Sequence, residues 1–166
     1  MPHSSWFFGS LISLSLLFTG CSGPTLPPGV PEPNRTALGC AEGLTVDFQA
    51  TTWAPGHYRF TVYLDGDTTV CEGDLPLGAC DAGPSLRCSP SATFQLGESG
   101  CALPPAQQGF SGLTVSRGPR RLEVAVEGNG HVLAEQRFEP AYRTVHPNGE
   151  GYPPSCTQAH EAMKLP

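Results

Sequence analysis

Hydrophobic and polar residues alternate in several short stretches between residues 44 and 145. In the first of them, Leu44, Val46 and Phe48 alternate with polar residues, and Tyr58–Leu64 repeats the pattern. A period of two residues is typical of a strand with one buried face. Asp65-Gly66 then predicts a tight turn and a hairpin into the next strand. The predicted strands lie near residues 44–49, 58–64, 68–71, 94–96, 113–115, 122–126, 132–138 and 142–145.

Apart from the short last segment, these are seven short strands separated by turn signals, which predicts an all-β domain of about seven strands. No stretch has the apolar periodicity of a long amphipathic helix. We therefore expect an immunoglobulin-like β-sandwich, with a Greek-key barrel as the alternative. The domain is expected to occupy residues 40–166 and to end in an irregular C-terminal tail.

The N-terminal segment has a different pattern. Trp6–Phe18 is an apolar run of 13 residues, broken only by Gly and Ser. It is shorter than the roughly 20 residues that span a bilayer, but matches the core of a signal peptide. The alternative is a buried helix of the folded domain. Leu17–Cys21 resembles a bacterial lipobox, and this resemblance implies that Cys21 receives diacylglycerol and becomes the first mature residue.

The lipobox departs from the usual pattern in two respects. Phe18 stands where leucine is common, and no Lys or Arg precedes the apolar run. A start codon further upstream would supply the missing basic residue. The prediction is a signal peptide at residues 1–20, followed by a lipidated cysteine.

A proline-rich segment follows the lipobox and separates it from the predicted domain. Ser22–Gly39 contains five prolines, which disfavour helix and central strand and favour an extended polyproline spacer. Residues 21–39 are therefore expected to be a stalk between the membrane and the domain. Ser22, rather than Asp, follows the lipidated cysteine, which by resemblance to enterobacterial sorting favours the outer membrane.

Charge narrows the range of partners. The net charge is −6, and the nearest approach to a basic cluster is Arg117, Arg120 and Arg121. An acidic domain without a basic stripe is not expected to bind nucleic acid. The expected partners are the membrane, through the lipid anchor, and an unidentified envelope protein or glycan.

Cysteine usage indicates an oxidising compartment. With Cys21 assigned to the lipid, the remaining cysteines are even in number, which predicts three disulfides with 15 possible pairings. The chain lacks the C-x-x-C pairs of a structural zinc site. The six disulfide candidates are Cys40, Cys71, Cys80, Cys88, Cys101 and Cys156.

The sequence resembles a group of uncharacterised lipoproteins from myxobacteria and related delta-proteobacteria. The resemblance covers most of the mature chain, but its motifs are structural and imply no activity. Members often carry a further cysteine near the position of Tyr152, which this chain lacks, so the resemblance leaves the pairing of Cys156 open. The matching segments are Leu38–Cys40, Gly43–Val46, Asp65-Gly66, Ser99–Pro104, Pro147–Gly149 and Pro153–Cys156.

Two metal sites can be considered. Cys156, His160 and Met163 have the ligand types and short spacing of a type 1 copper loop, but a disulfide at Cys156 would remove the thiolate. Calcium could be held by oxygens of the aspartates, although Asp65-Gly66-Asp67 is already explained by a turn. The other two candidate aspartates are Asp74 and Asp81. We expect no metal and no cofactor.

Catalytic motifs are incomplete. His160-Glu161 lacks the second histidine of H-E-x-x-H, and Gly109–Gly112 lacks the last glycine of G-x-S-x-G. His57, His131 and His146 lie beside Gly or Pro, so solvated loop positions are expected for all three, with no carboxylate placed to orient them.

Three aromatic residues could form a ligand platform. Tyr58 is in phase with the core, so we expect only Trp53 and Tyr63 to be exposed. Taken together, the sequence favours a non-catalytic envelope lipoprotein that binds a ligand or supports structure. The alternative is a small periplasmic hydrolase or a calcium- or copper-binding protein.

Overall fold

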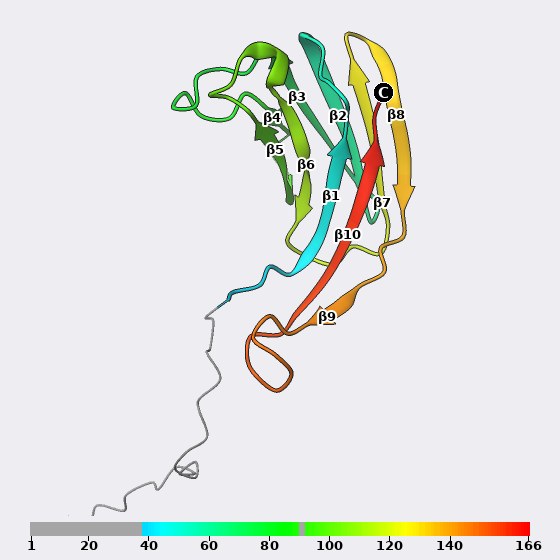
Figure 1. Ribbon diagram of the computed structural model, residues 1–166. Coiled ribbons are helices and arrows are strands. Elements are labelled where there is room, and N and C mark those ends of the chain that lie inside the picture. The colour runs from blue at the N-terminus through cyan, green and yellow to red at the C-terminus, as the bar shows by residue number, and fades with distance from the viewer. Residues whose placement is uncertain (1–37, 90–91) are drawn as a thin grey trace, which may run out of the picture. The chain divides into compact units, whose positions relative to one another are not determined.

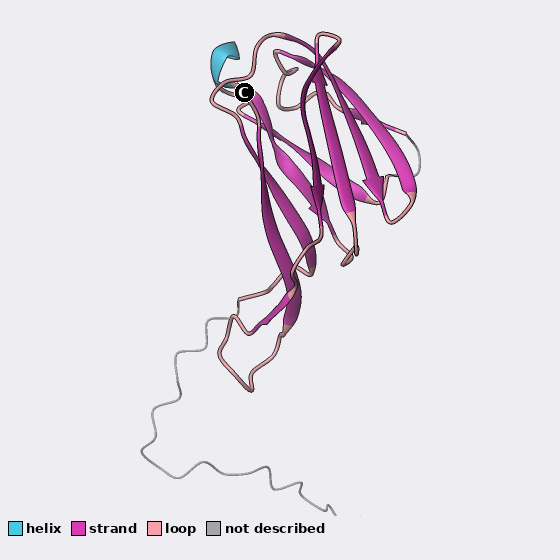
Figure 2. Cartoon of the chain, turned by 90° about the vertical axis from the view of Figure 1, so that its right-hand side faces the viewer, coloured by secondary structure: helices cyan, strands magenta, loops and turns pink. Residues whose placement is uncertain are grey.

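The computed structural model describes residues 38–89 and 92–166, and ten strands in these residues form two five-stranded sheets. The sheets pack face to face as a β-sandwich (Figures 1 and 2). Alternation of buried and exposed residues produces this arrangement, because each sheet can then bury one face against the other. The predicted all-β sandwich cross-linked by disulfides is confirmed, although the described residues form ten strands rather than about seven.

The first sheet, sheet A, contains the first and the last strand of the described chain. Its strand order is β5-β6-β1-β10-β9, with β1 parallel to β10 and the other neighbouring strands antiparallel. The strands are β1 (Gly43–Gln49), β5 (Phe94–Ser99), β6 (Gly109–Val115), β9 (Arg143–Val145) and β10 (Cys156–Lys164).

The second sheet, sheet B, is antiparallel throughout, in the order β4-β3-β2-β7-β8. The β2–β3 hairpin turns at Asp65-Gly66, as predicted, and both turn residues have positive φ. Its strands are β2 (Gly56–Leu64), β3 (Asp67–Leu75), β4 (Arg87–Cys88), β7 (Leu122–Gly128) and β8 (His131–Phe138).

The core lies between the sheets and is formed by alternate residues of the central strands. On β2, Tyr58, Phe60, Val62 and Leu64 are all buried, as the period of two predicted. The Tyr58 hydroxyl donates a hydrogen bond to the Ala54 carbonyl at 2.7 Å. Burial raises the pKa of Tyr58, so this hydroxyl keeps the proton that it donates.

The C-terminal tail differs from the prediction. We expected it to be irregular, but Cys156–Lys164 is a nine-residue strand that lies beside β1 in sheet A. Two of its inward positions, Ala159 and Glu161, do not stand out as hydrophobic, so the period of two is weak in the sequence. The strand is stabilised by its hydrogen bonds to β1, which lies more than 100 positions earlier in the chain. This pairing outweighs the weak local preference of the segment for a strand.

The two ends of the sandwich carry different structures (Figure 1). At one end, here called the junction end, the chain enters β1 and the loop of residues 146–155 connects β9 to β10. At the other, the loop end, lie the β1–β2 loop, the short 3-10 helix η1 (Pro105–Gln107) and the C-terminus. The candidate sites lie at these two ends.

Candidate functional site

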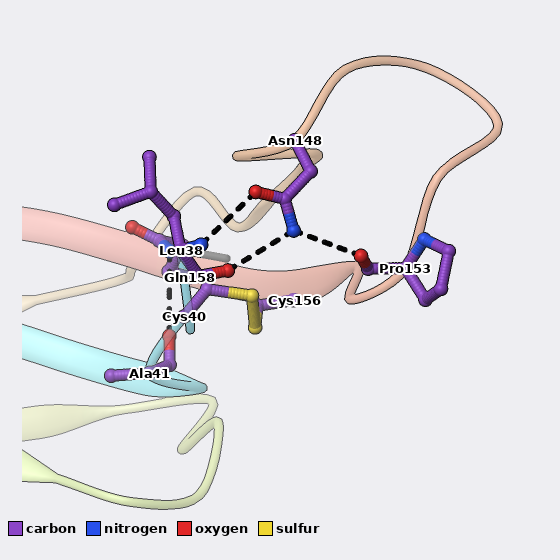
Figure 3. Close-up of a disulfide and its surroundings, with 7 residues drawn as sticks. All are labelled: Leu38, Cys40, Ala41, Asn148, Pro153, Cys156 and Gln158. Carbon is purple, nitrogen blue, oxygen red and sulfur yellow. Dashed lines mark hydrogen bonds between the residues drawn. A yellow bond between two sulfur atoms is a disulfide. The ribbon is translucent and has the colours of Figure 1, made fainter. Parts of the chain in front are cut away.

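The junction end is held by one disulfide and one asparagine (Figure 3). Cys40, three residues before β1, is bonded to Cys156, the first residue of β10. Beside this bond, Asn148 Oδ1 accepts a hydrogen bond from Leu38 N at 3.1 Å, and Asn148 Nδ2 donates to Leu38 O at 3.2 Å. Nδ2 also donates to the Pro153 carbonyl at 2.9 Å.

The side-chain amide of Asn148 therefore pairs with the backbone of Leu38 as a neighbouring strand would. A primary amide has one acceptor oxygen and two N–H donors, which is the set that this position uses. The turn that presents it is closed by Gly149 N donating to His146 O at 2.9 Å, with Gly149 at φ +96°. Pro147-Asn148-Gly149 is one of the segments that carry the resemblance, but its local sequence gives no sign that Asn148 pairs with Leu38.

Replacing Asn148 with alanine is expected to lower the free energy of unfolding by about 1 kcal/mol, because the lost hydrogen bonds are solvent-exposed. The amide proton of Leu38 should also exchange faster with solvent. Hydrogen exchange measured by NMR checks this directly. The matched variant Asn148→Asp keeps Oδ1 and should retain more protection at Leu38. Equal exchange rates in the wild type and in Asn148→Ala would contradict the assigned role.

The other disulfides lie closer to the loop end. Cys71–Cys88 joins β3 to β4, and Cys80–Cys101 joins the segment after β3 to the turn before η1. All six predicted cysteines are therefore bonded, in three pairs that the sequence had left open. The lipidation candidate, Cys21, lies outside the described residues, as do the predicted signal peptide and most of the stalk.

A hollow of about 500 Å³ opens at the loop end, beside the last residues of β1 and the first residues of β6. We call it the loop-end groove. Its apolar part is formed by Phe48, Trp53 and Phe110. Its exposed polar residues come from β1, the β1–β2 loop, β5, η1 and β6, and include Asp47, Gln49, Thr51, Ser99, Gln107 and Ser111.

Trp53 closes the end of the core next to this groove. We expected it to be exposed, but it is half-buried, with its ring centroid 5.1 Å from that of Phe110 and 5.3 Å from that of Tyr58. Both ring pairs are edge-to-face, a favourable arrangement for aromatic rings. The ring also lies against the backbone of Gly109, where a β-carbon would overlap it. The predicted exposure of Tyr63 and burial of Tyr58 are confirmed.

The wall of the groove near η1 is fixed by a buried glutamine. Gln108 is 6% exposed, and its Oε1 accepts a hydrogen bond from Leu77 N at 2.6 Å. Its Nε2 donates to Leu103 O at 2.9 Å. One side chain thus ties the segment after β3 to the turn before η1, which the Cys80–Cys101 disulfide also links. Buried and fully paired polar groups of this kind hold a site in one conformation.

The copper alternative is excluded by the structure. Cys156 is bonded to Cys40 and provides no thiolate. His160 and Met163 point to opposite faces of β10, since His160 is exposed and Met163 is 0% exposed in the core. A strand places residues three apart on opposite faces, so the spacing that suits a copper loop does not suit this element.

The aspartates considered for calcium do not gather. Asp65 Oδ1 accepts hydrogen bonds from the backbone N–H groups of Arg120 and Arg121 at 2.9 and 3.0 Å, so it joins the β2–β3 turn to the β6–β7 loop. Asp74 is paired with His57. Within residues 38–89 and 92–166, no group of three or more His, Cys, Asp or Glu residues lies close enough to hold a metal ion.

Two histidines have carboxylate partners that the sequence did not predict. His57 lies on β2 rather than in a loop, and its Nδ1 is 2.9 Å from Asp74 Oδ1. His160 Nε2 is 2.8 Å from Asp47 Oδ2. The His57–Asp74 pair follows from the register of the β2–β3 hairpin, whereas the His160–Asp47 pair depends on the long-range pairing of β10 with β1.

The serine considered from the sequence, Ser111, is not arranged with His160 as a catalytic nucleophile. Ser111, from the incomplete G-x-S-x-G motif, lies in the middle of β6 and is followed by strand, not by helix. The strand order β6-β1-β10 places Asp47 between Ser111 and His160. A triad needs the histidine between the serine and the acid, so this order is the wrong one.

Comparison of the chain with family models, with curated proteins and with solved structures finds no match. In the part of the chain that the structure describes, no helix is long and apolar enough to cross a membrane.

Proposed function

We propose that this chain is a non-catalytic lipoprotein of the bacterial cell envelope that binds an envelope ligand at the loop end of its sandwich. In this proposal residues 1–20 are the signal peptide, Cys21 carries the lipid at the outer membrane, and residues 21–39 are the stalk. The proposal is carried by one observation: the chain enters the sandwich at the junction end, and the groove opens at the opposite end.

The rest of the structure agrees with a binding role. A disulfide and the Asn148 hydrogen bonds hold the point where the stalk would join, and Gln108 holds the groove. A binding module needs rigidity at both places, because a preorganised site loses less entropy on binding. Both histidine–aspartate pairs lie on exposed strand faces, where solvent screens charge and weakens general acid–base chemistry.

Lipid attachment is tested with the full-length chain expressed in a bacterium that processes lipoproteins. The wild type should be found in the membrane fraction, whereas Cys21→Ser should lose that attachment. Intact-mass measurement should show a diacylated N-terminal cysteine. Reduction should add the mass of two hydrogens for each of three disulfides. Retention of Cys21→Ser in membranes to the same extent as the wild type would overturn the proposal.

A further inference from the structure

Most polar side chains of the loop-end groove can both donate and accept hydrogen bonds. Its exposed polar side chains are mostly hydroxyls and primary amides, such as those of Ser99, Gln107 and Ser111. Hydroxyl and amide groups both donate and accept hydrogen bonds. They suit a ligand whose own groups do both, which is the property of a sugar hydroxyl.

The described lining of the groove lacks the cationic side chains that bind anionic ligands. Among the described residues that line it, none is Lys or Arg, so no cation is placed to bind a phosphate, sulfate or carboxylate. Its single carboxylate, Asp47, is 2.8 Å from His160 Nε2. Among the described residues, two arginine–glutamate ion pairs lie on sheet B, where Arg59 pairs with Glu72 and Arg137 with Glu123. The groove therefore favours an uncharged ligand.

The apolar part of the groove adds a second type of contact. Trp53 is half-buried and lines the groove, and the buried rings of Phe48 and Phe110 pack against it from the core. A rigid aromatic surface beside convergent polar groups binds a ligand that has both apolar and polar faces. A pyranose ring has this character, with C–H groups on its faces and hydroxyls around its edge.

We propose that the loop-end groove binds a neutral glycan, a ligand class that rests on the binding role proposed above. The volume of about 500 Å³ is of the size usual for small-ligand sites. Asp47, at the β1 side of the groove, remains available to accept one further hydrogen bond from a hydroxyl. Gln107, on η1, also lines the groove, and its side-chain amide can both donate and accept hydrogen bonds.

Trp53 makes the binding directly measurable. The chain has two tryptophans, Trp6 and Trp53, so the full-length variant Trp6→Phe reports on the groove alone. Chitotriose, cellotriose and maltotriose are titrated separately, and an oligogalacturonate of similar length serves as the anionic counterpart. At least one neutral trisaccharide should change Trp53 fluorescence saturably below about 10 mM.

Two single substitutions in this background locate the site. Gln107→Ala removes an exposed groove side chain and should weaken binding of the responding trisaccharide about fivefold to tenfold, as expected for one lost hydrogen bond. Gln95→Ala removes an exposed glutamine of β5 that does not line the groove, and the affinity should be unchanged. Equal affinities in these two variants would overturn the assignment of the site.

A response to the anionic oligosaccharide alone would overturn the ligand class, and so would the absence of any response to all four sugars. Neither result bears on the lipid anchor, because membrane attachment of the wild type and its loss in Cys21→Ser are measured independently. The failure of the glycan assignment and the failure of the lipoprotein proposal are therefore distinguishable.

Discussion

Replacing Cys40 and Cys156 together with alanine is expected to lower the free energy of unfolding by about 4–5 kcal/mol. The two residues are 116 positions apart, so their disulfide closes almost the whole domain into one loop of the unfolded chain. In the chain-entropy description, the stabilisation by a disulfide increases with the logarithm of the loop that it closes. Of the three disulfides this one should therefore have the largest effect. Urea unfolding followed by circular dichroism measures the difference.

The matched control removes Cys80–Cys101, whose residues are 21 positions apart. By the same relation its loss should be about 1.5 kcal/mol smaller than the loss from Cys40–Cys156. Cys80 and Cys101 are also exposed, so alanine leaves no cavity there. If the two double variants were destabilised equally, loop closure would not be the reason why the junction disulfide stabilises the domain.

The sandwich could be predicted because the sequence of each central strand alternates between apolar and polar residues. On β2 and β7, large apolar residues such as Phe60 and Val124 stand at every second position, and each is 0% exposed. That pattern is present in any window of the sequence that covers the strand. The number of strands was underestimated because β4 has only two residues and β10 carries Ala and Glu at inward positions.

The pairing of the cysteines could not be predicted, for a different reason. Cys71 and Cys88 face each other because β4 pairs with β3, and a two-residue strand leaves almost no periodic signal. Cys40 reaches Cys156 because β1 and β10 run parallel, a contact between opposite ends of the domain. Spacing in the sequence has no information on such contacts, so the possible pairings remained open.

The loop-end groove was missed because it exists only in three dimensions. Trp53 was treated as a surface residue, since the loop that carries it has no strand pattern. Its burial depends on Gly109, a residue 56 positions later whose missing side chain leaves room for the indole ring. The sequence shows a glycine directly before Phe110, but it does not show that this glycine lies against Trp53.

The strand that was not predicted from the sequence connects the junction end to the loop end. β10 begins at Cys156, in the junction disulfide, and ends at Lys164, beside Gln49 of the loop-end groove. Pairing continues one step further, since Leu165 N donates to Gln49 O at 3.0 Å. The position of the groove relative to the junction therefore depends on β10 being held in the core.

Met163 is the residue that should hold β10 there. It is 0% exposed and lies opposite Phe48 in the parallel register. Met163→Ala is expected to lower the free energy of unfolding by about 2–4 kcal/mol, because it leaves a cavity in a closely packed core.

The neighbouring substitution Lys164→Ala changes an exposed side chain, and the free energy of unfolding of this variant should stay within about 0.5 kcal/mol of the wild type. Chemical unfolding of the two variants gives the comparison. A small effect at both positions would mean that the end of the chain does not pack into the sandwich, whereas a large effect at Met163 alone requires the buried strand.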